Sequence, residues 1–249
     1  MTSTIEFKPL NGPHGRLHTA FHACNGDNRA RVLMAHGFSP VLSMVEHGKV
    51  FVDAARSFGE VGIGAVLFDF GGNGWSDGHF SEMTPNRRID ELSFMLDQVK
   101  ADYDGPVFLL GQSMGGAIAI HTAATKQDML TGLITWSTVP SFDPKAKSAN
   151  WFPLQPEPDS VGTVGAGFFT DRPAESVGDA YVTIAIPKLQ VQGNLDRPGF
   201  IEDFTAFFDR APEPKQHIIV PNGNHVLDNR HARAEVISRT REWMLARCP

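Results

Sequence analysis

The chain has 249 residues, 41% of them hydrophobic and 20% charged, a composition that is ordinary for a single globular domain. Its formal net charge of −6, with Lys and Arg scattered along the sequence, argues against a nucleic-acid partner, because phosphate binding needs a basic surface. No apolar run approaches the roughly 20 residues that cross a bilayer, so a membrane partner is not expected either.

Short segments at the start of the chain predict an antiparallel hairpin at one edge of a sheet. Residues 5–7 and 16–23 form its arms around the turn sequence NGPHG. From residue 30 onward, strand-like and helix-like segments alternate. Strands are expected at residues 31–35, 65–70, 107–110, 132–137, 188–192 and 217–220, and helices at 45–58, 84–103, 114–126, 201–208 and 232–246. This alternation predicts an α/β fold with a mostly parallel twisted sheet and helices on both faces.

The regular pattern breaks down between residues 138 and 186. Prolines at positions 140, 144, 153, 156, 158 and 173 and a glycine patch at 162–167 leave little room for long helices or strands. We therefore expect a short lid insertion at 139–186 within one domain, whose core is formed by residues 1–138 and 187–249.

The N-terminus has no basic start followed by an apolar core, so we expect no secretory signal and a cytoplasmic location. The two cysteines, Cys24 and Cys248, belong to no CxxC motif or Cys/His cluster. We expect free thiols, no metal site and no cofactor.

A serine between glycines marks the point where an expected strand becomes an expected helix. Residues 107–117 read VFLLGQSMGGA, with Ser113 in a G-x-S-x-G pattern. In a chain with 24 glycines this pattern arises by chance often enough to be weak evidence alone. The strand and helix around it, however, are the context that a nucleophile elbow requires. The alternative is that Ser113 only caps the helix.

The flanking glycines fit the elbow interpretation. A serine at such a sharp turn adopts a strained backbone, and the strand and helix then approach each other two residues before and two residues after it. Gly111 and Gly115 stand at those two positions. The same geometry directs the backbone N–H of Met114, at the positive end of the helix, toward an oxyanion on the substrate.

A serine hydroxyl needs a base held by a carboxylate to act as a nucleophile. Asp196 follows the expected strand at 188–192, and His225 follows the strand at 217–220. Both lie where the C-terminal edge of the sheet is expected, and the order Ser, Asp, His is the one found with this type of elbow. Asp143 is the alternative acid, and Asp196 has the alternative role of a helix cap before Pro198.

The other histidines have simpler interpretations. His121 lies within the helix after Ser113 and is expected to pack or to face solvent, and His231 is expected at the solvated start of the last helix. Four more are expected in the hairpin or at the surface: His14, His18, His22 and His79.

The loop after the first parallel strand is expected to supply the second oxyanion donor. It reads Met34-Ala35-His36-Gly37-Phe38, in which Gly37 permits a tight turn and the N–H of Phe38 is the natural partner of the Met114 N–H. We assign His36 a structural role in bracing this loop, with its side chain directed away from the reacting centre.

Four segments together resemble the α/β-hydrolase superfamily: His36-Gly37-Phe38, the sequence DFGGNGWSDG at 69–78, the elbow at 111–115, and the Asp196 and His225 pair. The sequence from 69 onward is similar to small bacterial serine carboxylesterases of the cinnamoyl/feruloyl esterase type. The resemblance implies Ser113 as nucleophile, His225 as general acid and base, Asp196 as its orienting carboxylate, and Phe38 and Met114 as oxyanion donors.

The chain departs from that family in the GGNG loop. Gly72 and Asn73 stand where an arginine and a histidine are common, so the contact made by that arginine must be absent or replaced. A phosphate-binding interpretation of GGNG is rejected, because the loop lacks the lysine of GxxxxGK[ST] and does not match GxGxxG.

The expected reaction is hydrolysis of a small-molecule carboxylic ester with a small or aromatic acyl group. Alternatives are a thioesterase, an amidase or peptidase with the same triad, and a non-catalytic ligand-binding protein with this fold. A dehalogenase would need aspartate in place of Ser113. The sequence does not indicate an oligomeric state. Four aromatic residues of the insertion either line the substrate pocket or pack the insertion onto the core: Trp151, Phe152, Phe168 and Phe169.

Overall fold

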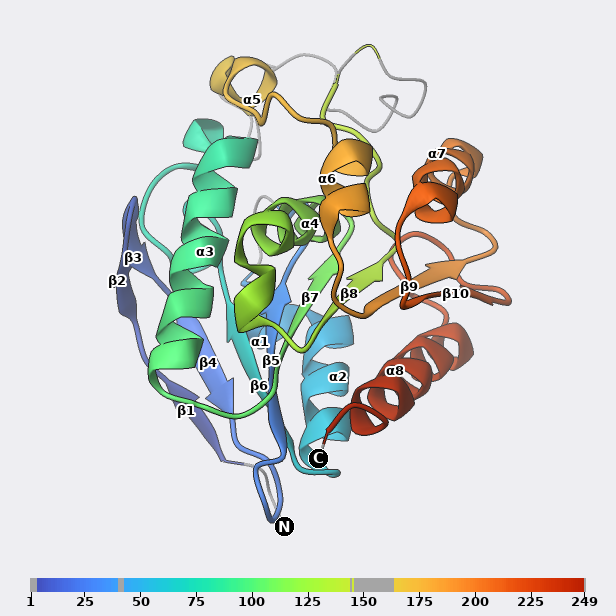
Figure 1. Cartoon of the computed structure of the whole chain (residues 1–249). Helices are drawn as coiled ribbons and strands as arrows, with labels where there is room; N and C mark the ends of the chain where they lie inside the picture. The colour runs from blue at the N-terminus through green and yellow to red at the C-terminus, as the bar shows by residue number, and fades with distance from the viewer. Residues whose placement is uncertain (1–3, 40–42, 144, 146–163, 249) are drawn as a thin grey trace.

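A central eight-stranded sheet organises the chain (Figure 1). The computed structural model describes residues 4–39, 43–143, 145 and 164–248. The strand order is β1-β4-β6-β5-β7-β8-β9-β10. The strands are β1 (Ile5–Phe7), β4 (Thr19–His22), β5 (Ala30–Ala35), β6 (Ile63–Phe68), β7 (Val107–Gln112), β8 (Gly132–Trp136), β9 (Lys188–Gly193) and β10 (Lys215–Val220). Neighbouring strands from β6 to β10 are parallel and β1 and β4 are antiparallel, which confirms the predicted mostly parallel α/β-hydrolase sheet.

Helices cover both faces of this sheet. The helices are α1 (Met44–His47), α2 (Lys49–Gly59), α3 (Pro85–Ala101), α4 (Met114–Lys126), α5 (Gly167–Thr170), α6 (Val177–Thr183), α7 (Pro198–Arg210) and α8 (Arg230–Leu245), with short 3-10 turns η1 (Phe80–Glu82) and η2 (Gln127–Met129). Buried residues of α3, α4, α6 and α7 form one apolar core, and those of α2 and α8 form the other.

The central strands are apolar along their whole length because both of their faces are buried. In β7, Val107 and Leu109 point into one core, whereas Phe108 and Leu110 point into the other. All four side chains are at most 1% exposed. This two-sided burial is the reason that the sequence shows a continuous apolar run here rather than an alternation of apolar and polar residues.

Two predicted elements are wrong in detail. The single helix expected at 45–58 is divided at Gly48, where a side chain would overlap the carbonyl of Met44. The expected strand at 16–23 is also divided. The turn NGPHG joins β2 (Leu10–Gly12) and β3 (Gly15–Leu17), which form a separate two-stranded sheet, while β1 pairs with β4.

The described part of the expected insertion contains more regular structure than the sequence suggested. Residues 164–186 include the short helices α5 and α6. Helix α6 is fixed against α7 by Tyr181, whose ring lies 5.4 Å from the rings of both Phe204 and Phe207. Short helices of this kind carry too few apolar repeats for a periodic signal in the sequence.

Candidate active site

The segments that follow four parallel strands meet at the C-terminal edge of the sheet, and three of them supply polar side chains. Gly37 follows β5, Ser113 directly follows β7, and Asp196 and His225 follow β9 and β10. In an open α/β sheet the carboxyl ends of the strands form the crevice in which ligands bind. The fold therefore brings residues that are 112 positions apart, Ser113 and His225, into direct contact.

Ser113 occupies a strained turn between β7 and α4. Its backbone angles are φ 55° and ψ −121°, outside the regions that side-chain-bearing residues usually adopt. A side chain at Gly111 would overlap the carbonyl of Gly115, and a side chain at Gly115 would overlap the carbonyls of Ala35 and His36. Gly111 is thus required by the close approach of β7 and α4, as the sequence predicts, whereas Gly115 is required by the close approach of α4 to the end of β5.

The hydroxyl of Ser113 does not cap the helix. Ser113 stands at the N-cap position of α4, but its side chain makes no capping hydrogen bond. Its Oγ lies instead 2.8 Å from Nε2 of His225. The interpretation of Ser113 as a simple helix cap is therefore wrong.

Asp196 holds the other side of the His225 ring. Nδ1 of His225 lies 2.9 Å from Oδ1 of Asp196 and must donate, because an ionised carboxylate only accepts. This fixes the tautomer in which Nε2 is free to accept the proton of Ser113. The alternative acid, Asp143, pairs instead with Arg172 at 3.7 Å.

The loops that carry Asp196 and His225 are joined by backbone contacts. The N–H of Asn194 donates to the carbonyl of Val220 at 3.0 Å, and the N–H of Leu195 donates to the carbonyl of Gly223 at 2.8 Å. A side chain on Gly193 would overlap the carbonyl of Gly223. These contacts fix the two loops relative to each other at the ends of the neighbouring strands β9 and β10, and thereby constrain the distance between the Asp196 carboxylate and the His225 imidazole.

Asp196 is ionised in this environment. Its side chain is fully buried, and burial alone would raise its pKa. Hydrogen bonds from His225, the N–H of Arg197 and the amide of Gln192 outweigh burial and lower the pKa of Asp196 below its usual value. The carboxylate can therefore stabilise a positive charge on His225.

The loop after β5 lies against Ser113. A Cβ on Gly37 would stand 2.9 Å from Cβ of Ser113, so only glycine allows this approach. The next residue, Phe38, is fixed by an edge-on contact with Phe80 at 5.0 Å between ring centroids. Met114 is the first residue of α4, and amides at this position lack partners within a helix.

His36 braces the loop after β5, as the sequence predicted. Its Nε2 accepts the N–H of Phe70 at 3.2 Å, and its Nδ1 lies 2.7 Å from the carbonyl of Gly37. Burial, together with the charge of Arg88, lowers the pKa of His36 to about 3 despite the bond to Gly37. The ring therefore stays neutral and acts as a fixed hydrogen-bonding link between β5 and β6.

Sequence reasoning missed an arginine from another element that lies against the GGNG loop. Gly72 has φ +75°, and a Cβ there would lie 2.6 Å from the backbone of His79, so this position excludes any side chain. Helix α3 supplies an arginine instead: the guanidinium of Arg88 lies 4.5 Å above the ring of Phe70 and donates to Asn73 at 2.7 Å. The helical spacing could have indicated that Arg88 is buried, because Arg88 lies one turn before the buried Leu92 and therefore on the same face of α3.

Asp69, which follows β6, is a second missed residue. Its carboxylate accepts the hydroxyl of Ser43 at 2.7 Å and the N–H of Met44 at 2.7 Å. These bonds satisfy the first amides of α1 and anchor the far end of the segment that begins at His36. Burial is the main influence on Asp69 and raises its pKa, although all of these hydrogen bonds oppose that rise.

Two of the four predicted pocket aromatics, Trp151 and Phe152, lie outside the described residues. Phe168 is 1% exposed and is part of the apolar core, and Phe169 packs edge-on against it at 5.3 Å. In this arrangement both side chains fix α5 to the rest of the molecule, as the packing alternative expects.

A cavity of about 700 Å³ opens beside Ser113 and His225. Its walls come from the loop after β5, the junction of α1 and α2, and the segment after β10. Apolar side chains in the lining are Phe38, Met44, Val50 and Val226. The volume falls within the range that holds a small organic molecule.

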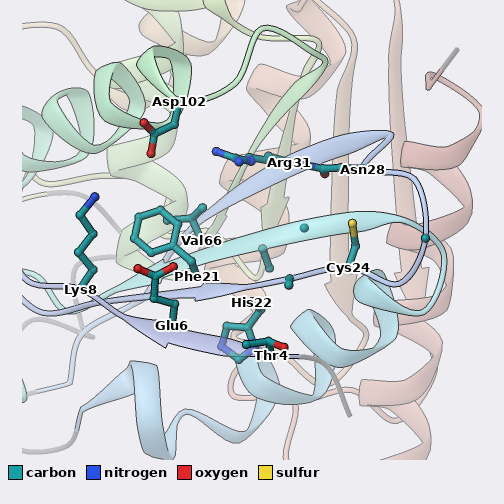
Figure 2. Close-up of a pocket in the computed structure, with 14 residues that line it drawn as sticks. Thr4, Glu6, Lys8, Phe21, His22, Cys24, Asn28, Arg31, Val66 and Asp102 are labelled. Carbon is teal, nitrogen blue, oxygen red and sulfur yellow. The ribbon is translucent and has the colours of Figure 1, made fainter. Parts of the chain in front are cut away.

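A separate cavity of about 420 Å³ lies beside the antiparallel strands (Figure 2). Phe21 and Val66 contribute apolar surface there, and Arg31 and Asp102 approach from above in this view. None of Ser113, Asp196 and His225 lines it, so the candidate site is not continuous with this cavity.

Within the described part of the chain, no group of three or more His, Cys, Asp or Glu side chains is placed to hold a metal ion. None of the described helices is both long enough and apolar enough to cross a membrane.

Part of the chain is similar in sequence to known proteins. The family model described as serine aminopeptidase, S33, matches residues 26–157. Over 115 residues the chain is 31% identical to lipase LipV of Mycobacterium tuberculosis, and over 125 residues it is 31% identical to human monoglyceride lipase. These segments cover 46% and 49% of this chain and 39% of each relative, so the chain spans about two fifths of the length of the curated relatives it matches.

The fold is similar over nearly its whole length to a solved structure. Est1E from Butyrivibrio proteoclasticus, with ferulic acid bound, superposes with a TM-score of 0.83 at 19% identity, covering 96% of this chain and 98% of Est1E. At this identity the likeness concerns the fold. The family model, in contrast, matches more than half of the chain, including the elbow. The chain belongs to the serine aminopeptidase S33 family of α/β hydrolases.

Proposed function

We propose that this protein hydrolyses carboxylic esters of small or aromatic acids through a covalent acyl-enzyme. The observation that carries the proposal is the chain of contacts at the elbow. Ser113 Oγ lies 2.8 Å from His225 Nε2, and His225 Nδ1 lies 2.9 Å from the buried carboxylate of Asp196. A nucleophile, a base and an orienting acid in this geometry are the requirements for acyl transfer.

In the first half of the reaction, Ser113 Oγ attacks the ester carbonyl while its proton moves to Nε2 of His225. The carbonyl π bond becomes an oxyanion, which the N–H groups of Phe38 and Met114 stabilise. The oxyanion then collapses, the bond to the alkoxy oxygen breaks, and the alcohol leaves with the proton from His225. The ionised Asp196 stabilises the imidazolium between these two proton transfers.

In the second half, water replaces the alcohol. His225 takes a proton from the water as it attacks the acyl-enzyme carbonyl, and the same two amides stabilise the second oxyanion. Collapse returns the proton to Ser113 and releases the carboxylic acid. Every step uses groups of this chain and one water molecule.

The substrate class is inferred from the cavity and the relatives. The cavity beside Ser113 has about 700 Å³, which suits a compact or aromatic acyl group. Its lining is mixed, with four apolar side chains and the charged side chains of Lys49, Arg197, Asp228 and Arg233. Two relatives are lipases by name, and the fold is similar to a structure that holds ferulic acid. Ester hydrolysis is the reaction that these observations support together.

The test is hydrolysis of p-nitrophenyl esters of increasing acyl length, and of methyl ferulate, by the wild type and by Ser113→Ala. Ser238→Ala serves as the control, because that hydroxyl lies on α8 and bonds to Glu242 at 3.0 Å. We expect turnover in the wild type and the control and none in Ser113→Ala, with a preference for short or aromatic acyl groups.

Other outcomes would change the proposal in defined ways. Covalent labelling of Ser113 by a fluorophosphonate without any ester turnover would redirect it to thioesters or amides, which the same residues can cleave. Ester turnover that persists in Ser113→Ala would reject Ser113 as the nucleophile. Ligand binding without labelling or turnover would indicate a binding protein.

A further inference from the structure

Two residues after β6, Phe70 and Asn73, contact the segment that carries the expected oxyanion donor. We call residues Gly37, Phe38 and Ser39 the oxyanion loop. The N–H of Phe70 donates to His36, which precedes the loop, and the side-chain amide of Asn73 donates to the carbonyl of Ser39 at its end. The peptide that presents the Phe38 N–H is thus held on both sides.

Asn73 is an internal residue with two defined partners. It is 1% exposed, and its Oδ1 accepts a hydrogen bond from Nη2 of Arg88 at 2.7 Å. A guanidinium only donates and a carbonyl only accepts, so these partners fix the orientation of the amide, with its NH₂ directed to Ser39. The Asn73 amide therefore links Arg88 to the oxyanion loop through one hydrogen bond on each side.

Arg88 is fixed in turn by its surroundings on α3. It is 1% exposed, and its guanidinium lies 4.5 Å above the ring of Phe70. The negative charge of Glu91 stabilises the charged form of Arg88. Glu91 accepts the N–H of Gly71 at 3.0 Å. Both ends of the helical turn from Arg88 to Glu91 are therefore tied to the segment after β6.

This arrangement is costly for the fold. Burial lowers the pKa of Arg88 to about 10, so the buried side chain remains charged at neutral pH. Among the described residues, its Nε and Nη1 have no hydrogen-bond partner. An apolar side chain would avoid the cost of burying these groups. An apolar side chain could not supply the hydrogen bond to Asn73, nor the cation–π contact with Phe70 and the attraction to Glu91 that hold the guanidinium in place for that bond.

We propose that Asn73 and Arg88 are positioning residues that hold the oxyanion loop at the distance from Ser113 at which the Phe38 N–H stabilises the transition state. This inference rests on the proposed ester hydrolysis. Neither side chain lines the cavity beside Ser113, so both act through the loop. Oxyanion stabilisation depends on sub-ångström placement of the donor, and its loss lowers kcat more than it raises KM.

The most direct test is Asn73→Asp. Aspartate has nearly the same shape and keeps an acceptor for Arg88, but as a carboxylate it cannot donate to the carbonyl of Ser39. We expect kcat to fall about 10-fold or more with KM changed less than about 3-fold. The affinity for a trifluoromethyl ketone that mimics the tetrahedral intermediate should fall by the same factor as kcat/KM, while the melting temperature stays near that of the wild type.

Arg88 is tested with a matched pair of variants. Arg88→Met removes the donor to Asn73, and Arg88→Lys retains a charge that can reach it. The control is Lys188→Met, which also removes a buried cation, here one that donates to the carbonyl of Ile184 at 2.7 Å at the start of β9, four strands away from β6 in the sheet. We expect Arg88→Met to lower kcat, Arg88→Lys to restore part of it, and Lys188→Met to lower only stability.

The outcomes separate this inference from the function on which it rests. If Asn73→Asp and Arg88→Met keep the wild-type kcat and the wild-type affinity for the ketone, the positioning role is rejected, even when ester hydrolysis stands. If Arg88→Met does not fold, Asn73→Asp alone decides the question. If the wild type neither hydrolyses esters nor reacts with a fluorophosphonate at Ser113, the proposed function fails and this inference fails with it.

Discussion

The two halves of the candidate site are held in place by different means. The half that contains Ser113, Asp196 and His225 is built from residues in the loops that follow strands, and its geometry follows from the parallel sheet and from glycines at close approaches. The half that contains Phe38 depends on side chains from the segment after β6 and from α3. The first half is therefore expected to resist change except at the reacting groups, and the second to be sensitive to substitutions outside the cavity.

The largest expected effect comes from removing the base of the first half. His225→Ala should lower kcat on the order of 10⁴-fold or more, because Ser113 then has no acceptor for its proton and the triad acts as a unit. His231→Ala is the matched control, since His231 is exposed at the start of α8. The measurement is steady-state kinetics with a p-nitrophenyl ester, and a His225→Ala enzyme within 10-fold of the wild type would contradict the expectation.

Asp196→Asn should have the next largest effect. The NH₂ group of asparagine donates a hydrogen bond, so it favours the tautomer of His225 in which Nδ1 is unprotonated and Nε2 carries the proton. Nε2 then cannot accept the proton of Ser113, and a loss of about 10³- to 10⁴-fold in kcat is expected. Asp143→Asn is a close control, because Asp143 was the alternative acid and pairs with Arg172 instead. Equal losses in both variants would show that the choice between the two carboxylates is wrong.

Gly37→Ala tests the second half of the site. The new Cβ would stand 2.9 Å from Cβ of Ser113, so the oxyanion loop must shift, and we expect kcat to fall about 10²-fold with a smaller change in KM. In Gly64→Ala, the control, the nearest atom to the new Cβ is 3.5 Å away. Kinetics on the same ester would test this, and an unchanged kcat would show that the loop tolerates displacement.

The proximity of Ser113, Asp196 and His225 could be predicted from the sequence because each residue stands in a local pattern. Ser113 has its glycines, and Asp196 and His225 come soon after expected strands whose carboxyl ends lie at one edge of the sheet. The second half rests on contacts such as Asn73 with Ser39, 34 positions apart, and Arg88 with Asn73, 15 apart, which depend on how α3 packs on the loop. An arginine on the inner face of a helix looks in sequence like an interruption of the apolar pattern.

The division of the expected helix at 45–58 was missed for a related reason. Gly48 is tolerated within helices, and nothing in the sequence around it shows that Ser43 caps a first short helix bonded to Asp69. The predicted role of the insertion's aromatic residues as pocket walls likewise depended on packing. The structure buries Phe168 in the apolar core, a distinction that residue type alone does not make.

The smallest expected effect concerns the pH dependence of folding stability, which is separate from the pH dependence of the reaction. His121 is buried in α4, and burial lowers its pKa from 6.5 to about 4. As the pH falls from about 6.5 to about 4, His121 is protonated in the unfolded chain but stays neutral in the folded chain. Folding stability is therefore lost in that pH range. At pH 5 this amounts to about 2 kcal/mol relative to pH 8.

His121→Phe should reduce the difference in unfolding free energy between pH 8 and pH 5 by about that amount, measured by urea denaturation. Thr122→Val, at the next position of α4, alters a buried polar group that does not titrate and should leave the difference unchanged. The same pH dependence in wild type and His121→Phe would mean that His121 is protonated in the folded protein.

The central claim, that Ser113 is the nucleophile activated by His225, is tested most directly by identifying the modified residue after reaction with a fluorophosphonate. Peptide mass spectrometry should find one adduct, on Ser113, that forms in the wild type, forms far more slowly in His225→Ala, and is absent in Ser113→Ala. An adduct on another residue, or hydrolysis of esters by a protein whose Ser113 remains unmodified, would contradict the claim.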